Sequence, residues 1–125
     1  MKAENCRVAI ADDEAMIRYA LKSIINSLNM HCAGEATNGQ EAVALYAQEK
    51  PDIIFLDINM PVKNGDEALA EIRARFPDAN VVMLTSVAET QTVKKCVQGG
   101  AINYILKTNH LDNIKTMIAD IVNNL

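Results

Sequence analysis

The chain has 125 residues, half of them apolar, which is enough for one domain and too few for two ordinary ones. Its net charge is −4 and its basic residues are scattered, which argues against a broad nucleic-acid surface. The three cysteines form no CxxC pair and are odd in number, so we expect free thiols. Because no apolar run approaches ~20 residues and no signal peptide fits before the first predicted strand, we expect a cytoplasmic protein without a membrane span.

The first half of the chain predicts three strands and two helices. Residues 6–11 predict a strand, and residues 31–36 predict a weaker one. The run at 52–57 is continuously apolar up to Asp57, which is typical of a strand buried on both faces. Helical spacing of apolar residues predicts helices at 15–29 and 39–48. Their inward residues are predicted to be Ile17, Leu21, Ile24, Ile25 and Leu28 in the first helix, and Ala42, Leu45 and Tyr46 in the second.

The second half continues the alternation. Asn64 stands three residues before Glu67, which predicts the N-cap of a helix that ends at Pro77-Asp78. Strands are predicted at 80–85 and 101–106, and a helix at 89–98 ends at Gly99-Gly100. The last helix is predicted from about His110, with Asn109 as its cap. The inward residues of these helices are predicted to be Leu69, Ile72 and Phe76, then Val93, Cys96 and Val97, then Ile114, Met117, Ile118, Ile121 and Val122.

Five strand–helix pairs in strict alternation predict one α/β domain over residues 1–125. The pattern favours a doubly wound parallel sheet with helices on both faces and right-handed crossovers. In such a sheet, a ligand site lies beyond the carboxyl ends of the strands, where the strand order reverses.

Polar residues stand at the predicted carboxyl ends of four strands. Asp12-Asp13 follows the first strand, Asp57 ends the third, Thr85-Ser86 ends the fourth and Lys107 follows the fifth. If the first and third strands are neighbours, about 4.8 Å apart, three carboxylates crowd together. Such a group takes up a proton or a cation. Because the available ligands are oxygens, the pattern favours Mg²⁺ over Zn²⁺.

This set of side chains suits phosphoryl chemistry. A carboxylate such as Asp57 can act as a nucleophile and form an aspartyl phosphate. Lys107 and Thr85 can each hold a phosphoryl oxygen, which is the positioning that phosphoryl transfer requires. Taken singly, each residue is more often a turn residue, a strand end or a solvated lysine. Their joint occurrence at the matching ends of four strands favours the functional interpretation.

These residues give the chain an end-to-end resemblance to a known family. Asp12-Asp13, "FLDINMP", Gly65, "MLTS" and "GGAINYILK" together resemble the CheY-like receiver domains of two-component response regulators. The resemblance implies a flavodoxin-like (βα)5 fold with strand order 2-1-3-4-5. It also implies a phospho-accepting regulator, rather than an enzyme acting on other molecules, that takes a phosphoryl group from a sensor histidine kinase or a phosphotransfer protein.

The resemblance assigns a role to each matching residue. Asp57 would accept the phosphoryl group, with Lys107 and Thr85 contacting it. Asp13 would bind Mg²⁺ directly, Asp12 mainly through water and Asn59 through its backbone carbonyl, beside Asp57. Thr85 would move toward the phosphate, and Tyr104 would rotate inward and alter the face made by the fourth helix, fifth strand and fifth helix. Ser86 matches a position where a small residue keeps the pocket open.

Two positions depart from the family's pattern. The residue after Lys107 is Thr108, where the family usually has a proline preceded by a cis bond; a cis bond before a non-proline residue costs ~2.5–4 kcal/mol, so a trans bond is the expectation here. Val87 offers no polar atom to orient an attacking water, which predicts slow self-dephosphorylation. A longer half-life of the aspartyl phosphate in the wild type than in Val87→Glu would support this, and equal half-lives would contradict it.

Alternatives remain open from the sequence. The chain resembles a stand-alone receiver that acts on a protein partner, but it equally fits the receiver of a longer, DNA-binding regulator. An Asp-nucleophile, Mg²⁺-dependent phosphatase is the alternative of another class, although such enzymes usually carry Asp-x-Asp on the first strand. A nucleotide- or flavin-binding module ranks last, because neither GxGxxG nor a P-loop motif occurs. A homodimer is possible, whereas direct nucleic-acid or membrane contact is not expected.

Overall fold

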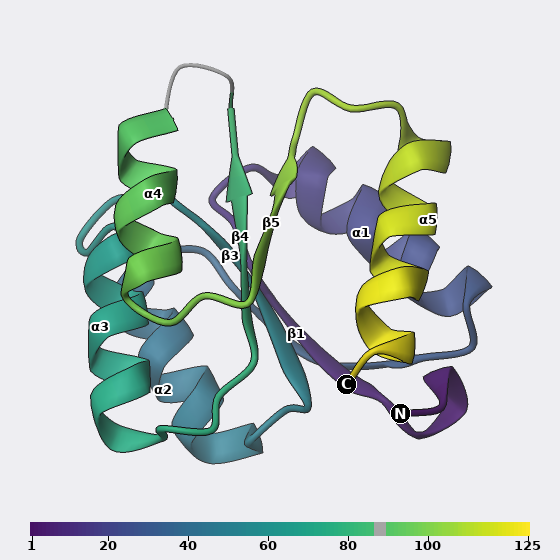
Figure 1. Cartoon of the computed structure of the whole chain (residues 1–125), viewed down its shortest axis with the longest axis horizontal. Coiled ribbons are helices and arrows are strands. Elements are labelled where there is room, and N and C mark those ends of the chain that lie inside the picture. The colour runs from purple at the N-terminus through teal and green to yellow at the C-terminus, as the bar shows by residue number, and fades with distance from the viewer. Residues whose placement is uncertain (87–89) are drawn as a thin grey trace.

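One parallel sheet of five strands forms the centre of the protein (Figure 1). The structure is a computed structural model and describes residues 1–86 and 90–125. The strand order is β2-β1-β3-β4-β5, which confirms the predicted topology. Residues of β3 and β4 are buried throughout, as their continuous apolar runs predict. The strands are β1 (Arg7–Ala11), β2 (His31–Ala36), β3 (Ile53–Asp57), β4 (Val81–Thr85) and β5 (Asn103–Leu106).

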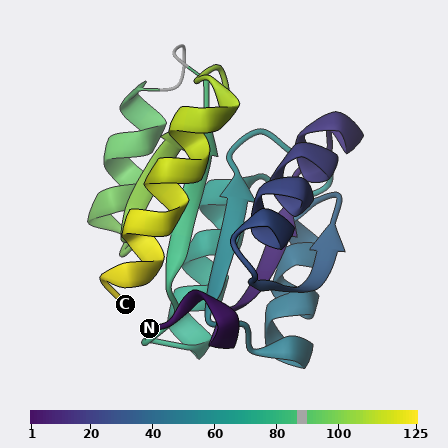
Figure 2. The same cartoon turned by 90° about the vertical axis from the view of Figure 1, so that its right-hand side faces the viewer.

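Helices cover both faces of the sheet. One face packs against α2, α3 and α4, whose buried residues include Tyr46, Ile72 and Cys96. The other face packs against α1 and α5, which lie in front of the sheet in Figure 2. None of the helices in the described ranges is long and apolar enough to cross a membrane. Their bounds are α1 (Ala15–Ser27), α2 (Gly39–Glu49), α3 (Gly65–Arg75), α4 (Thr90–Gln98) and α5 (Leu111–Asn123), preceded by a 3-10 turn, η1 (Ala3–Asn5).

The two faces receive alternate residues of the central strands. Ile54 and Leu56 of β3 point into the core beneath α2, α3 and α4, whereas Ile53 and Phe55 point toward α1 and α5. All four side chains are fully buried. A strand buried in this way has little freedom to move, so the residue at its end is held rigidly.

Two details of the sequence-based prediction are wrong. Val97 was expected to face the core, but it is 48% exposed, while Val93 and Cys96 carry the packing of α4. The N-cap of α5 is His110 rather than Asn109, and the Asn109 side chain instead donates to the sulfur of Met117. The other boundaries agree within about two residues, and Asn64 caps α3 by accepting a hydrogen bond from the Glu67 amide.

The chain termini lie together at the edge of the sheet opposite the carboxyl ends of the strands (Figures 1 and 2). The amino group of Met1 donates to a carboxylate oxygen of Leu125 at 2.8 Å. The carboxyl edge carries the loops that follow β1, β3 and β5. The backbone amide of Lys107 donates to the Thr85 carbonyl at 2.8 Å, which ties the ends of β4 and β5 together.

Candidate functional site

Acidic and basic residues from three strand ends meet at the point where the strand order reverses. Asp12 follows the last residue of β1, Asp57 ends β3 and Lys107 follows β5. The strands β1 and β3 are parallel neighbours, with Ala11 opposite Leu56. The strand β2 lies on one side of this pair, and β4 and β5 lie on the other. These residues therefore gather at the switch point, which is where a ligand site is expected in such a sheet.

Four carboxylates form a cluster, and three of them, Asp12, Glu14 and Asp57, contact the Lys107 ammonium. Ligand oxygens of Asp12, Asp13, Glu14 and Asp57 lie within 4.8 Å of one another. The Lys107 Nζ lies 3.1 Å from Asp12 Oδ2 and 3.4 Å from Asp57 Oδ2. Asp12 and Asp57 are buried, at 0% and 3% exposure. The three acids expected from the sequence are thus brought together with the lysine.

Glu14 is the site residue that the sequence analysis missed. Its Oε1 lies 2.6 Å from Lys107 Nζ, closer than either aspartate. It is the N-cap of α1, yet its side chain makes no capping hydrogen bond. Two signals were available: Glu14 directly follows Asp12-Asp13, and glutamate is not among the residues that helix N-caps prefer. A residue that breaks a local rule beside a charged cluster is a candidate for a functional role.

The cluster shifts the proton affinity of its members. Burial, followed by the charge of Asp12, raises the pKa of Asp57 to about 7, although Lys107 opposes the shift. Burial also raises the pKa of Asp12, against the hydrogen bond from the Glu14 amide and the neighbouring Lys107 ammonium. Burial alone would lower the pKa of Lys107, but its contacts with Glu14, Asp57 and Asp12 outweigh this and raise the pKa. The Lys107 ammonium by itself does not balance the crowded acids.

The donor set fits a hard divalent cation. The Asp12 Oδ2 atom is buried and makes no hydrogen bond to the described residues, although it lies 3.1 Å from the Lys107 ammonium. The other oxygen of Asp12, Oδ1, accepts a hydrogen bond from the Glu14 amide at 2.8 Å. A buried carboxylate oxygen that forms an ion pair but no hydrogen bond, among three further carboxylates, matches the all-oxygen coordination that Mg²⁺ prefers.

The carboxylates open into a pocket of about 480 Å³. Asn59 lines it, as its predicted place beside Asp57 requires, and so does Ser86. The Lys107–Thr108 peptide bond is trans, as the absence of proline led us to expect. Val87 falls in the segment 87–89 and lies outside the described residues. The lining residues are Asp13, Glu14, Ile17, Asp57, Asn59, Ser86, Lys107 and Thr108.

Thr85 and Tyr104 lie beside a second, adjoining cavity. This cavity has about 210 Å³ and is also lined by Ser86, which borders the carboxylate pocket as well. Thr85 is buried, and its hydroxyl donates to the Ser86 carbonyl at 3.0 Å. Tyr104 is 43% exposed. The space next to both side chains is what an inward rotation of Tyr104 would need.

The loop after β3 is held tightly behind Asp57. The Gly65 amide donates to the Ile58 carbonyl at 2.6 Å, and a Cβ at Gly65 would overlap the Asp57 carbonyl oxygen. Val62 adopts φ 68°, a conformation that is costly for a β-branched residue. The Lys63 amide donates to the Pro61 carbonyl across it, at 2.7 Å. The loop is thus strained and closely packed beside the buried acid.

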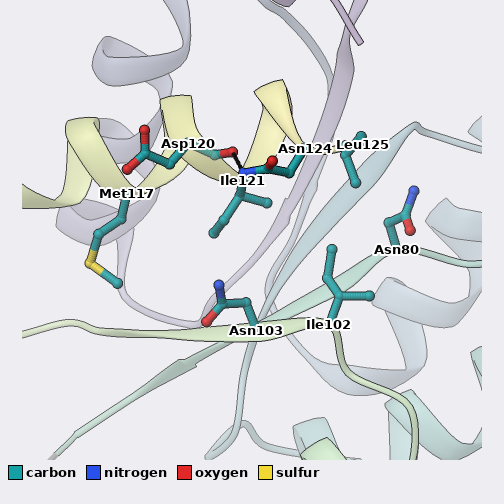
Figure 3. A pocket seen from close by; sticks show the side chains of 8 residues that line it. All are labelled: Asn80, Ile102, Asn103, Met117, Asp120, Ile121, Asn124 and Leu125. Atoms are coloured by element: carbon teal, nitrogen blue, oxygen red, sulfur yellow. Dashed lines mark hydrogen bonds between the residues drawn. The ribbon is translucent and has the colours of Figure 1, made fainter.

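A larger cavity, of about 590 Å³, lies far from this chemistry. Figure 3 shows it between the C-terminal half of α5 and the start of β5, with Ile102 and Asn103 facing Met117 and Ile121. Asp120 has the one charged side chain among the described lining residues, and the Asn124 side chain donates to the Asp120 carbonyl at 2.8 Å. The described lining offers no cluster of groups able to bind a metal or a phosphate.

This chain is similar in sequence to known proteins of one family. A family model described as "Response regulator receiver domain" matches residues 8–119. The chemotaxis protein CheY of Thermotoga maritima is 42% identical over 101 residues, covering 81% of this chain and 84% of that protein. The uncharacterized transcriptional regulatory protein YxjL of Bacillus subtilis is 36% identical over 108 residues, covering 86% of this chain. The match spans only 50% of YxjL.

Solved structures agree with the family match. The response regulator domain of Thermotoga maritima CheB has a TM-score of 0.87 and 32% sequence identity, with 96% of this chain and 95% of that one covered. A chain from the CheX-CheY-BeF3-Mg+2 complex of Borrelia burgdorferi has a TM-score of 0.88 and 26% identity, with 98% of both chains covered.

Proposed function

This chain belongs to the response regulator receiver domain family, and we propose that it works as a phosphorylation switch whose phospho-acceptor is Asp57. The observation that carries the proposal is the burial of Asp57 against Asp12 with the Lys107 ammonium 3.4 Å away. A carboxylate in this setting can act as a nucleophile. It also lies among crowded negative charges, whose balance would change when a phosphoryl group and a cation bind.

The proposed reaction transfers a phosphoryl group to a carboxylate oxygen. An oxygen of Asp57 forms a bond to phosphorus while the bond from phosphorus to the donor breaks. In a phosphohistidine donor, the electron pair of that bond stays on the imidazole nitrogen; in a small acyl phosphate it stays on the carboxylate oxygen. Lys107 holds a phosphoryl oxygen and stabilises the charge that develops there. Thr85 supplies a hydroxyl to another oxygen.

The carboxylates provide the place for Mg²⁺. Asp12, Asp13 and Asp57, with the backbone carbonyl of Asn59, would hold it. When bound, the cation neutralises negative charge on the phosphoryl oxygens and on the acids. The buried Oδ2 of Asp12, which pairs with the Lys107 ammonium but makes no hydrogen bond to the described residues, supports this assignment.

The switch would run from Thr85 to Tyr104. A phosphoryl group adds roughly −1.5 to −2 charges and several acceptor oxygens, which attract the Thr85 hydroxyl. Because the cavity beside Thr85 also borders Tyr104, a shift of Thr85 gives that ring room to rotate inward. The exposed surface of α4, β5 and α5 would change with it and bind a downstream partner or output domain.

Partners follow from the family and its relatives. A sensor histidine kinase or phosphotransfer protein would donate the phosphoryl group in the cytoplasm. CheY and CheB relatives point to a chemotaxis-type partner protein, whereas YxjL, which is about twice as long as the match, points to an attached output domain. A homodimer through α4, β5 and α5 is a further outcome to be measured.

Intact mass spectrometry after incubation with Mg²⁺ and a small acyl phosphate tests the proposal. One phosphate adduct is expected on the wild type and on Asp78→Asn, an exposed aspartate remote from the site. No adduct is expected on Asp57→Asn or without Mg²⁺. An unmodified wild type would refute the proposal. Continuous release of phosphate from a generic phosphate ester would instead support the phosphatase alternative.

A further inference from the structure

The Lys107 ammonium makes its closest contact with a residue outside the proposed phosphorylation chemistry. Its Nζ lies 2.6 Å from Glu14 Oε1, compared with 3.1 Å from Asp12 Oδ2 and 3.4 Å from Asp57 Oδ2. A charge-assisted hydrogen bond strengthens as it shortens. In the resting protein, Glu14 is therefore the nearest of three carboxylates that position the Lys107 ammonium.

The backbone of Glu14 is fixed from both sides. Its amide donates to Asp12 Oδ1 at 2.8 Å, and its carbonyl accepts from the amides of Ile17 and Arg18 at 3.1 and 3.2 Å. The first turn of α1 thus sets the position of its Cα. Because the side chain leaves the helix end uncapped, it is free to reach Lys107.

Burial separates Glu14 from the other partners of Lys107. The Glu14 side chain is 59% exposed, whereas those of Asp12 and Asp57 are 0% and 4% exposed and that of Lys107 is 14% exposed. Water can solvate Glu14 as soon as it loses the ammonium, but a buried acid cannot be solvated in this way. Of the three carboxylate partners of the Lys107 ammonium, Glu14 is therefore the one whose contact is lost at the least cost in free energy.

We propose that Glu14 is a positioning residue that holds the Lys107 ammonium in the resting protein and must release it when Asp57 carries a phosphoryl group. The inference rests on the proposed function, since it concerns the lysine of that reaction. A lysine has three N–H donors, and a phosphorylated Asp57 offers new dianionic oxygens inside the site. These oxygens compete with the solvent-exposed carboxylate for the same ammonium.

Glu14 has a second effect through its charge. Its carboxylate lies within 4.8 Å of the other three acids, so it adds to the negative field that an anionic donor meets. The Glu14→Gln variant keeps the side-chain size, frees Lys107 and removes one unit of that charge. At saturating Mg²⁺, we expect Asp57 phosphorylation by a small acyl phosphate to be about three- to tenfold faster. Half-saturation by Mg²⁺ should need a severalfold higher concentration.

Matched variants separate this effect from general changes. Glu49→Gln also removes a glutamate from an ion pair, with Arg7 at 3.0 Å, but near the opposite edge of the sheet. It should leave the phosphorylation rate within about twofold of the wild type. Glu14→Ser removes the charge and provides a preferred N-cap side chain. It should accelerate phosphorylation as Glu14→Gln does, whereas opposite effects of the two would assign the change to the helix end and overturn the proposal.

An NMR measurement tests the release itself. The ammonium signal of Lys107, assigned by its loss in Lys107→Gln, is recorded in the resting protein and with Mg²⁺ and beryllofluoride, a phosphoryl mimic. Wild type and Glu14→Gln should differ at rest and converge once the mimic is bound. An equal difference in both states, or a Glu14→Gln rate matching that of Glu49→Gln, would overturn the inference. Wild type that forms no adduct would refute the proposed function instead.

Discussion

Replacing Asp57 by asparagine should stabilise the fold at alkaline pH. The native state raises the pKa of Asp57 from 3.8 to about 7, chiefly through burial and then through the charge of Asp12. Between these values the native state binds more protons than the unfolded state, so stability falls as pH rises. The stability associated with a protonated Asp57 is fully present below about pH 4 and is lost as pH passes through about 7. An asparagine side chain in its place has no charge to bury.

The pKa shift sets the expected magnitude. A rise of about three in the pKa of Asp57 corresponds to ~4 kcal/mol of lost folding free energy when the carboxylate is fully ionised. Lys107 contacts both Asp12 and Asp57, so part of this free energy redistributes to the remaining acid, and we expect Asp57→Asn to gain about 2 kcal/mol at pH 8. For a domain of this size, that gain raises Tm by roughly 6–10 °C. At pH 5 the gain should fall below about 1 kcal/mol, since Asp57 is then largely protonated.

Thermal unfolding in EDTA at pH 5 and pH 8 provides the assay. Asp78→Asn, an exposed aspartate, controls for the general loss of a negative charge. Added Mg²⁺ should raise Tm of the wild type more than that of Asp57→Asn, which narrows the gap at pH 8. Equal Tm values for Asp57→Asn and Asp78→Asn at pH 8 would refute the argument that burial of a crowded charge destabilises the resting protein.

Three further substitutions test other parts of the site by urea unfolding. Lys107→Gln removes the ammonium that contacts the buried acids and should cost about 3 kcal/mol at pH 8 in EDTA; an equal loss at pH 5 would contradict the electrostatic reason. Val62→Asn should add about 1 kcal/mol, because asparagine tolerates φ 68° better than valine, and any loss would contradict strain there. Gly65→Ala should cost at least about 2 kcal/mol through overlap with the Asp57 carbonyl, while Gly99→Ala, with 3.3 Å of clearance, should cost less.

The fold was predictable because its signals are local and repeated. Continuous apolar runs at β3 and β4 can be satisfied only by burial on both faces, and the intervening helices have one apolar side. Given strict alternation, a parallel sheet with its site at the carboxyl edge follows. The positions of Asp12, Asp57 and Lys107 at that edge required no knowledge of side-chain contacts.

The misses depend on tertiary contacts that spacing does not encode. Val97 lies at the border of the apolar stripe of α4, where neighbouring helices decide whether a side chain is covered. The direction of the Glu14 side chain depends on Lys107, which is 93 residues away in the sequence.

Charge crowding and phosphate contacts contribute separately to the proposed switch. Mg²⁺ or loss of the Asp57 charge relieves the crowding of Asp12 and Asp57, but neither supplies oxygens that attract Thr85. A phosphoryl group does both, and the bond from the Lys107 amide to the Thr85 carbonyl couples the two strand ends that respond. Asp57→Asn should therefore be more stable than the wild type and yet leave Tyr104 outside the adjoining cavity. The free energy of unfolding and the population of the activated surface are therefore separate quantities. The second changes only when a ligand, here the phosphoryl group, contacts the activated arrangement better than the resting one.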